Sequence, residues 1–185
     1  MRTVLIGCGA GAALGLRVIS GGGAAAAASI PAALLFAAAA LTVAIAAGWR
    51  PGRLRLGAAA AGAAAGLFLV LAWLLARAPD ATFPSPQVGA LAVWTPAVAL
   101  VVIAEEALLR GVLFDAVSGW RGVPAALGIT SVVFALLHLP LYGVQALPLD
   151  LGVGVFLGGL RVMTGGVAAP AFAHLVADLG GGWLA

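Results

Sequence analysis

Long runs of apolar residues limit what this chain can fold into. A helix needs about 20 apolar residues to cross a bilayer. Seven such runs are present, at roughly residues 3–19, 27–48, 57–76, 87–117, 123–140, 149–163 and 167–184. Only 8% of the 185 residues are charged, against about 25% in soluble domains. The sequence therefore predicts an all-α fold, a polytopic bundle of about seven transmembrane helices in a lipid bilayer. The long fourth run would tilt, break near Pro96, or run out of the membrane past Arg110.

The few charged side chains predict how the helices are oriented. All nine basic residues are arginines. The predicted spans place Arg50, Arg53, Arg55 and Arg121 on one side of the membrane. The connection "LYGVQALPLD" on the other side has no basic residue. Because basic loops favour the cytoplasm, we expect a multi-pass protein of a bacterial-type cytoplasmic membrane with a cytoplasmic N-terminus. The sequence has no run of basic residues of the kind that binds nucleic acid.

The proline-rich stretch "RAPDATFPSPQ" divides the chain at its weakest join. We expect residues 1–86 to supply N-terminal helices that complete the bundle. Residues 87–185 should supply the helices of the functional site, within the same membrane domain. Two GxxxG pairs, which begin at Gly62 and Gly154, allow helices to approach closely. In a chain so rich in glycine, they favour packing inside the bundle over a dimer interface.

Several ionisable side chains stand out because they fall inside the apolar C-terminal half. A charged side chain near the bilayer centre costs about 2.5 to 3.5 kcal/mol on insertion scales, so each one needs a partner or a purpose. The polar residues of this half are Glu105, Glu106, Arg110, Asp115, His138, His174 and Asp178. Both histidines of the protein are among them, which points to a polar site.

Helix geometry separates the two adjacent glutamates. Glu106 and Arg110 are four residues apart, so they share a helix face and can form an ion pair. Glu105 points about 100° away around the helix. We therefore expect Arg110 to neutralise Glu106, and Glu105 to face a polar cavity where it acts as a general base.

Each histidine has a second marked side chain one turn away. Phe134 precedes His138 by four residues, so the two share a helix face. Asp178 follows His174 by the same interval. At 1.5 Å per residue, Glu105 lies about 22 Å and His138 about 27 Å from the turn between their antiparallel helices. Two readings stay open: histidines that only bridge helices, with Phe134 in the core and Asp178 orienting His174, or one site to which three helices contribute.

Three motifs, in this order and spacing, give the chain a resemblance to a known family. "EEALLR", "FALLH" and "HLVAD" fit the pattern EExxxR, FxxxH and HxxxN or HxxxD. They resemble the CPBP family of intramembrane proteases, which includes the type II CAAX prenyl endopeptidases and the Abi (bacteriocin self-immunity) proteins of bacteria. The similarity covers roughly residues 87–182.

The resemblance implies a role for each motif residue. Glu105 and His138 would activate a water molecule that attacks a peptide carbonyl. His174 and Asp178 would face the oxyanion of the tetrahedral intermediate. The supporting residues would be Glu106, Arg110 and Phe134.

One position departs from the family pattern and bears on a metal. Where the prenyl proteases typically have asparagine, this chain has Asp178, whose ionised carboxylate would repel an oxyanion. Asp178 is then protonated, orients His174, or ligates a metal. The same four catalytic candidates offer the donor atoms of a zinc site, but we favour catalysis by glutamate and histidine without an obligatory metal. The glycines at residues 7–12 make no dinucleotide site, because no acidic residue follows about 20 positions on.

These observations predict an intramembrane endopeptidase, glutamic or metal-dependent, that acts on a peptide or membrane-protein substrate. For a bacterial-looking chain, a peptide, a bacteriocin or a membrane protein is a better expected substrate than a prenylated protein. The alternative is non-proteolytic: an immunity or scaffold protein, or an ion or proton pathway that uses the same acids and histidines. A scaffold would keep its function in Glu105→Gln, and a pathway would move charge without making new peptide termini.

Overall fold

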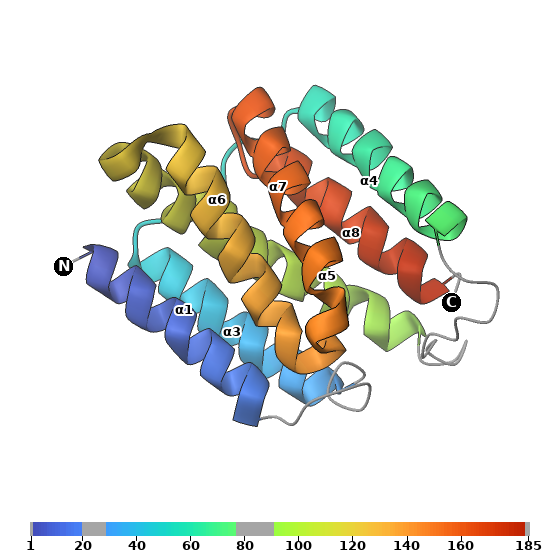
Figure 1. Ribbon diagram of the computed structural model, residues 1–185, viewed down its shortest axis with the longest axis horizontal. Helices are drawn as coiled ribbons and strands as arrows, with labels where there is room; N and C mark the ends of the chain where they lie inside the picture. The colour runs from blue at the N-terminus through green and yellow to red at the C-terminus, as the bar shows by residue number, and fades with distance from the viewer. Residues whose placement is uncertain (1, 20–28, 77–90, 184–185) are drawn as a thin grey trace.

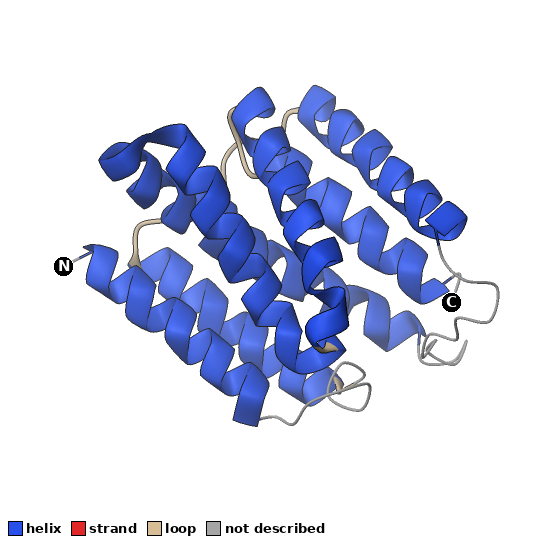
Figure 2. Cartoon of the chain, viewed as in Figure 1, coloured by secondary structure: helices blue, strands red, loops and turns tan. Residues whose placement is uncertain are grey.

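The chain folds almost entirely into helices. The computed structural model describes residues 2–19, 29–76 and 91–183, and within these ranges it contains helices and no strand (Figure 2). The helices in chain order are α1 (Arg2–Ile19), α3 (Ile30–Ala46), α4 (Leu56–Ala76), α5 (Leu91–Glu106), the π-helix η2 (Ala107–Leu113), α6 (Phe114–Tyr142), the short 3₁₀-helix η3 (Val144–Ala146), α7 (Leu147–Thr164) and α8 (Ala168–Trp183). The prediction of an all-α fold is confirmed.

The end of α5 and the π-helix η2 form the centre of the molecule. The residues from Ala107 to Val112 are all buried. Helices α3 and α8 pack against α5, while α3 and α6 pack against η2. Figure 1 shows α1 beside α3, α6 beside α7, and α4 beside α8. Helices from both halves of the chain therefore enclose the point where α5 ends.

The predicted fourth and fifth helices join differently from the expectation. Pro96 stays inside α5, and the helix changes to π geometry at Ala107–Leu113. Of the three alternatives for the long fourth run, a break near Pro96 is therefore not observed. The turn between the two runs lies at Gly122, whose φ of 82° falls in the left-handed region that glycine adopts without strain because it has no Cβ atom.

Fewer of the described helices meet the length and hydropathy expected of a membrane span than the sequence predicts. Among the described residues, two helices are long and apolar enough to cross a bilayer, Leu56–Leu75 with a mean hydropathy of 2.2 and Val144–Thr164 with 1.5. Helix α5 has 16 residues but continues directly into η2 and α6, up to the turn at Gly122. Each of the seven predicted runs contains a described helix, but seven spans are not confirmed. The cytoplasmic N-terminus stays a prediction.

Glycines let two pairs of helices approach closely. A Cβ atom at Gly66 of α4 would lie 2.6 Å from the carbonyl oxygen of Ala173 and from the Cβ of Val176, both on α8. A Cβ atom at Gly154 of α7 would lie 2.9 Å from the Cα of Ser131 on α6. Only a residue without a side chain fits at these distances. The prediction that the GxxxG pairs pack helices inside the bundle is confirmed.

We predict that Gly66→Ala destabilises the protein, because the added methyl group would overlap the backbone of α8. Overpacking of this kind typically costs about 1 to 3 kcal/mol and should lower the melting temperature of the detergent-solubilised protein. Gly57→Ala, on the same helix, is the matched control, since a Cβ atom at Gly57 meets nothing within 4 Å. Equal melting temperatures for the two variants would contradict the close packing of α4 on α8.

Candidate active site

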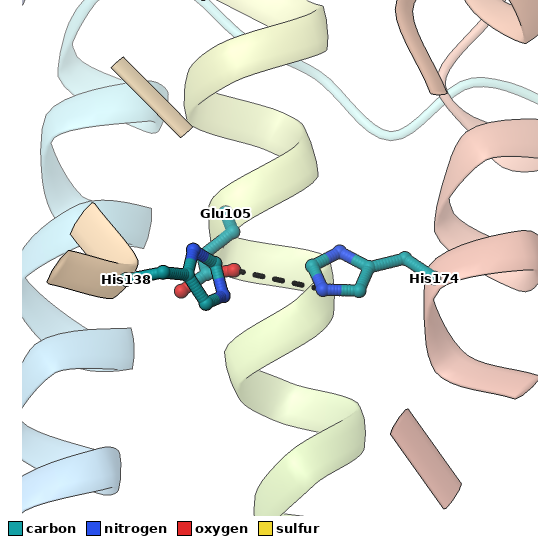
Figure 3. Close-up of side chains that lie close together, drawn as sticks. All are labelled: Glu105, His138 and His174. Carbon is teal, nitrogen blue, oxygen red and sulfur yellow. Dashed lines mark ion pairs between the residues drawn. The ribbon is translucent and has the colours of Figure 1, made fainter. Parts of the chain in front are cut away.

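Three helices bring one carboxylate and two imidazoles together at the centre of the molecule. Glu105 is the next-to-last residue of α5, His138 lies on α6 and His174 on α8. One donor atom of each lies within 4.8 Å of the others, and Figure 3 shows the three side chains pointing toward one another. Glu105 and His174 are buried, with 1% and 2% of their surface exposed. The side chains expected from the three motifs therefore meet, while their catalytic roles stay predictions.

The expected pairing of the second glutamate with the arginine is present. Arg110 Nη1 donates a hydrogen bond to Glu106 Oε1 at 2.9 Å, and both side chains are fully buried. Arg110 Nη2 donates to the carbonyl oxygen of Gly154 on α7 at 3.1 Å. The guanidinium also lies 4.7 Å from the ring centroid of Phe134 on α6. Arg110 thus links η2 to both helices of the α6–α7 pair.

A second arginine, Arg161 in the last turn of α7, also contacts the π-helix. Arg161 Nε donates to the carbonyl oxygen of Arg110 at 2.9 Å, and Arg161 Nη2 pairs with Asp115 Oδ1 at 2.8 Å. Isolated turns of π-helix inside α-helices are rare and are frequent at functional sites. No local spacing pairs Asp115 with Arg161, which lie 46 residues apart, so this contact was not predicted.

Glu106 does more than neutralise Arg110. Its Oε1 atom also lies 3.0 Å from Nδ1 of His174. Because an ionised carboxylate only accepts hydrogen bonds, Nδ1 carries the proton and donates it. Nε2 is then the ring atom directed at Glu105, whose Oε2 lies 3.9 Å away. Glu106 therefore fixes the orientation of His174, a role that spacing along one helix did not predict.

His138 is fixed in a similar way by a backbone carbonyl. Its Nδ1 lies 2.9 Å from the carbonyl oxygen of Phe134, and because a carbonyl only accepts, Nδ1 is the donor. A neutral His138 ring therefore keeps its lone pair on Nε2. The rings of Phe134 and Tyr142 pack against the imidazole, with centroid distances of 4.3 and 5.8 Å. Phe134 thus supports His138 with both its backbone and its ring.

Asp178 lies at the edge of the site. Its Oδ2 atom is 3.5 Å from Nε2 of His174, and its side chain is 41% exposed. Asp178 does not belong to the group whose donor atoms lie within 4.8 Å of one another. The predicted ligand set of four residues is therefore reduced to three, because Asp178 sits on the exposed side of His174. Of the roles left open for it, orienting His174 fits this position.

The three remaining residues suit a catalytic zinc site. Such sites commonly use three protein ligands, two histidines and a glutamate among them, and keep a fourth position open. Histidine ligands almost always hold their second ring nitrogen against a hydrogen-bond acceptor. His138 does so with the Phe134 carbonyl and His174 with Glu106. The group of Glu105, His138 and His174 could therefore hold a divalent metal.

One buried acid near the site was not among the predicted residues. Asp150 lies in the first turn of α7, is 9% exposed, and its Oδ2 has no hydrogen-bond partner among the described residues. Its charge acts on both histidines and on Glu105. A signal was present in the sequence, because Asp150 is an ionisable residue inside the predicted apolar run 149–163.

The described helices form an apolar bundle that buries a glutamate beside two histidines. The family model of the type II CAAX prenyl endopeptidases, Rce1-like, matches residues 87–180, about half of the chain, and includes all three motifs. The chain belongs to this family of membrane proteases, and the predicted resemblance is confirmed. Neither a curated protein nor a solved structure matches the chain. The division into residues 1–86 and 87–185 stays a prediction.

We predict that Arg110→Gln strongly destabilises the protein, by about 3 to 5 kcal/mol, because it leaves Glu106 buried without its cation. The double variant Glu106→Gln/Arg110→Gln should lose less than the sum of the two single variants, since no charge is left uncompensated. Unfolding of the wild type, both single variants and the double variant in detergent gives the coupling energy. Arg121→Gln, at an exposed arginine, is the control and should change little. Strictly additive losses would refute the coupling.

Proposed function

We propose that this protein is an intramembrane endopeptidase that hydrolyses a peptide bond with a water molecule activated by Glu105 and His138. Membership of a protease family supports the peptidase class. The observation that carries the mechanism is the approach of the Glu105 carboxylate to two imidazoles, each held at Nδ1 by an acceptor. Each ring therefore has Nε2 left for the reaction.

In this mechanism Glu105 and Nε2 of His138 hold the water molecule. Glu105 removes one proton from the water as the water oxygen bonds to the carbonyl carbon of the substrate. The carbonyl π electrons move onto the oxygen and form the tetrahedral oxyanion. When the oxyanion collapses, the C–N bond breaks, its electron pair goes to the nitrogen, and Glu105 gives the proton to the leaving amine. The products are one new carboxyl terminus and one new amino terminus.

His174 is the candidate for stabilising the oxyanion. Glu106 holds its Nδ1, and its Nε2 lies 3.9 Å from Glu105 Oε2 and 3.5 Å from Asp178 Oδ2. With a proton on both ring nitrogens, His174 would be an imidazolium that keeps Nδ1 on Glu106 and offers its Nε2 proton to the oxyanion. Donors positioned before the reaction lower the barrier most where bulk water is excluded. Asp178 cannot donate when ionised. Its role would be to hold the Nε2 proton of His174 until the oxyanion forms.

A divalent metal is compatible with the same three side chains. Glu105, His138 and His174 would be its ligands, and a bound zinc ion would supply Lewis acidity toward the peptide carbonyl and acidify the attacking water. The proposed path assigns the proton transfers to Glu105 and the orientation of the water to His138, so it does not require the ion.

We predict that Glu105→Gln abolishes proteolysis, because the amide cannot take a proton from water. Loss of a general base typically lowers the rate by about 10²- to 10⁴-fold. Mass spectrometry of new peptide termini, after incubation of the purified protein with a digest of membrane proteins, measures this loss. Asp115→Asn is the control: it also changes a carboxylate to an amide, but at an exposed residue that pairs with Arg161. Identical new termini from the wild type and Glu105→Gln would refute the hydrolase mechanism.

We predict that a zinc chelator leaves the rate of proteolysis unchanged. Glu105 and His138 supply the base and the water-binding group themselves, so the reaction should need no added Lewis acid. The same peptide assay with and without chelator, together with the zinc content of the purified protein by elemental analysis, measures the dependence. Loss of activity in chelator that added zinc restores would show instead that the three residues act as metal ligands.

A further inference from the structure

One face of α7 is directed at the π-helix η2 and at α6. Asp150, Gly154, Gly158 and Arg161 follow one another at intervals of four, four and three residues, which places them on one side of the helix. The contacts fix where that side points. The carbonyl oxygen of Gly154 accepts from Arg110 Nη2, and Arg161 Nε donates to the carbonyl oxygen of Arg110. Asp150 continues this face one turn toward the start of α7.

The packing of α6 against α7 shows which residues of α6 lie opposite Asp150. Gly154 lies against Ser131 on α6, and the two helices run antiparallel. One turn further along each helix, Asp150 comes opposite residue 135, less than a turn before His138. His138 is among the groups that interact electrostatically with Asp150. Asp150 therefore stands beside the proposed water-binding histidine.

Asp150 has no cation of its own among the described residues. The residue is 9% exposed, and Oδ2 has no hydrogen-bond partner among the described residues. The nearby guanidinium of Arg110 is engaged by Glu106 and by the carbonyl oxygen of Gly154. The ionisable groups of the site are the carboxylates of Glu105, Glu106, Asp150 and Asp178, the guanidinium of Arg110, and the imidazoles of His138 and His174. Even with His174 protonated, as the proposed mechanism requires, these four carboxylates outnumber the cations Arg110 and His174.

A buried carboxylate without a cation is costly, because it loses its hydration and gains nothing in return. The position of Asp150 in the first turn of α7 offsets part of this cost through the positive end of the helix dipole. The dipole adds no hydrogen-bond donor to Oδ2. Asp150 is also absent from the group of donor atoms that lie within 4.8 Å of one another, which argues against a role as a metal ligand.

We propose that Asp150 binds a cationic side chain of the substrate, lysine or arginine, close to the scissile peptide bond. This inference rests on the proposed endopeptidase activity and adds the substrate class to it. An ammonium or guanidinium group would form the ion pair that Asp150 lacks, and a neutral side chain would leave the carboxylate unpaired. Sites built to pair with a substrate group discriminate strongly against analogues without that group. Asp150 is thus a specificity-determining residue.

The test compares matched peptides cut by the full-length protein in detergent. A peptide with lysine near the cut, found in the digest of membrane proteins, is compared with the same peptide carrying norleucine at that position. We expect the kcat/KM of the wild type to be at least about tenfold higher for the lysine peptide than for the norleucine peptide. A factor of this size corresponds to the free energy of a hydrogen bond to a charged group. Asp150→Asn should bring this ratio close to one and still cut the norleucine peptide. Asp115→Asn, the control, should keep the ratio of the wild type.

Two further variants distinguish the loss of a substrate contact from a loss of folding. Asp150→Glu keeps the charge and should keep the preference for lysine, whereas Asp150→Lys should favour a peptide with glutamate at the same position. Cutting by the wild type with no preference for basic residues, or a preference that survives Asp150→Asn, would overturn the inference and leave the endopeptidase standing. Absence of any cutting that depends on Glu105 would overturn both. A loss of bound zinc in Asp150→Asn, with an unchanged ratio, would also overturn the inference and identify a metal ligand.

Discussion

The buried ion pair between Glu106 and Arg110 is the contact on which the rest of the site depends. Arg110 reaches the backbone of Gly154 on α7 and the ring of Phe134 on α6. Glu106 reaches the Nδ1 atom of His174 on α8. The pair itself spans the junction of α5 and η2. One charge pair therefore contacts α6, α7 and α8 at once.

This ion pair is not a source of stability in the ordinary sense. Removing two charges from water costs several kcal/mol per ion, and the Coulomb attraction offsets this only when the remaining polar atoms are satisfied. Here Glu106 Oε2 and Arg110 Nε have no hydrogen-bond partner within the described part of the chain. The pair instead favours one arrangement of the helices over others, because a shifted helix would leave a buried charge without its partner. The small residue at Gly154 contributes to the same end, since the absence of a side chain exposes its carbonyl oxygen to the guanidinium.

The sequence predicted the local features of this protein well and the long-range ones unevenly. Helix positions and the Glu106–Arg110 pair depend on apolar runs and on spacing within one helix, which are local properties. Counting the rise along antiparallel helices also placed Glu105 near the level of His138. The contact of Glu106 with His174 joins residues 68 positions apart and depends on how α8 packs. Asp150 was missed because its segment was interpreted as a connection between helices, and the π-helix was missed because no spacing rule distinguishes it from an α-helix.

The π-helix has a consequence for how the chain can change length. It places Glu105 and Glu106 before it and Phe114 and Asp115 after it, all in helices that continue in the same direction of winding. Deleting one residue between 107 and 113 would still leave a helix, but it would rotate everything that follows by about 100° and shift it by about 1.5 Å. Arg161 would then no longer face both the carbonyl of Arg110 and the carboxylate of Asp115. Relatives of this protein should therefore keep the number of residues in this segment.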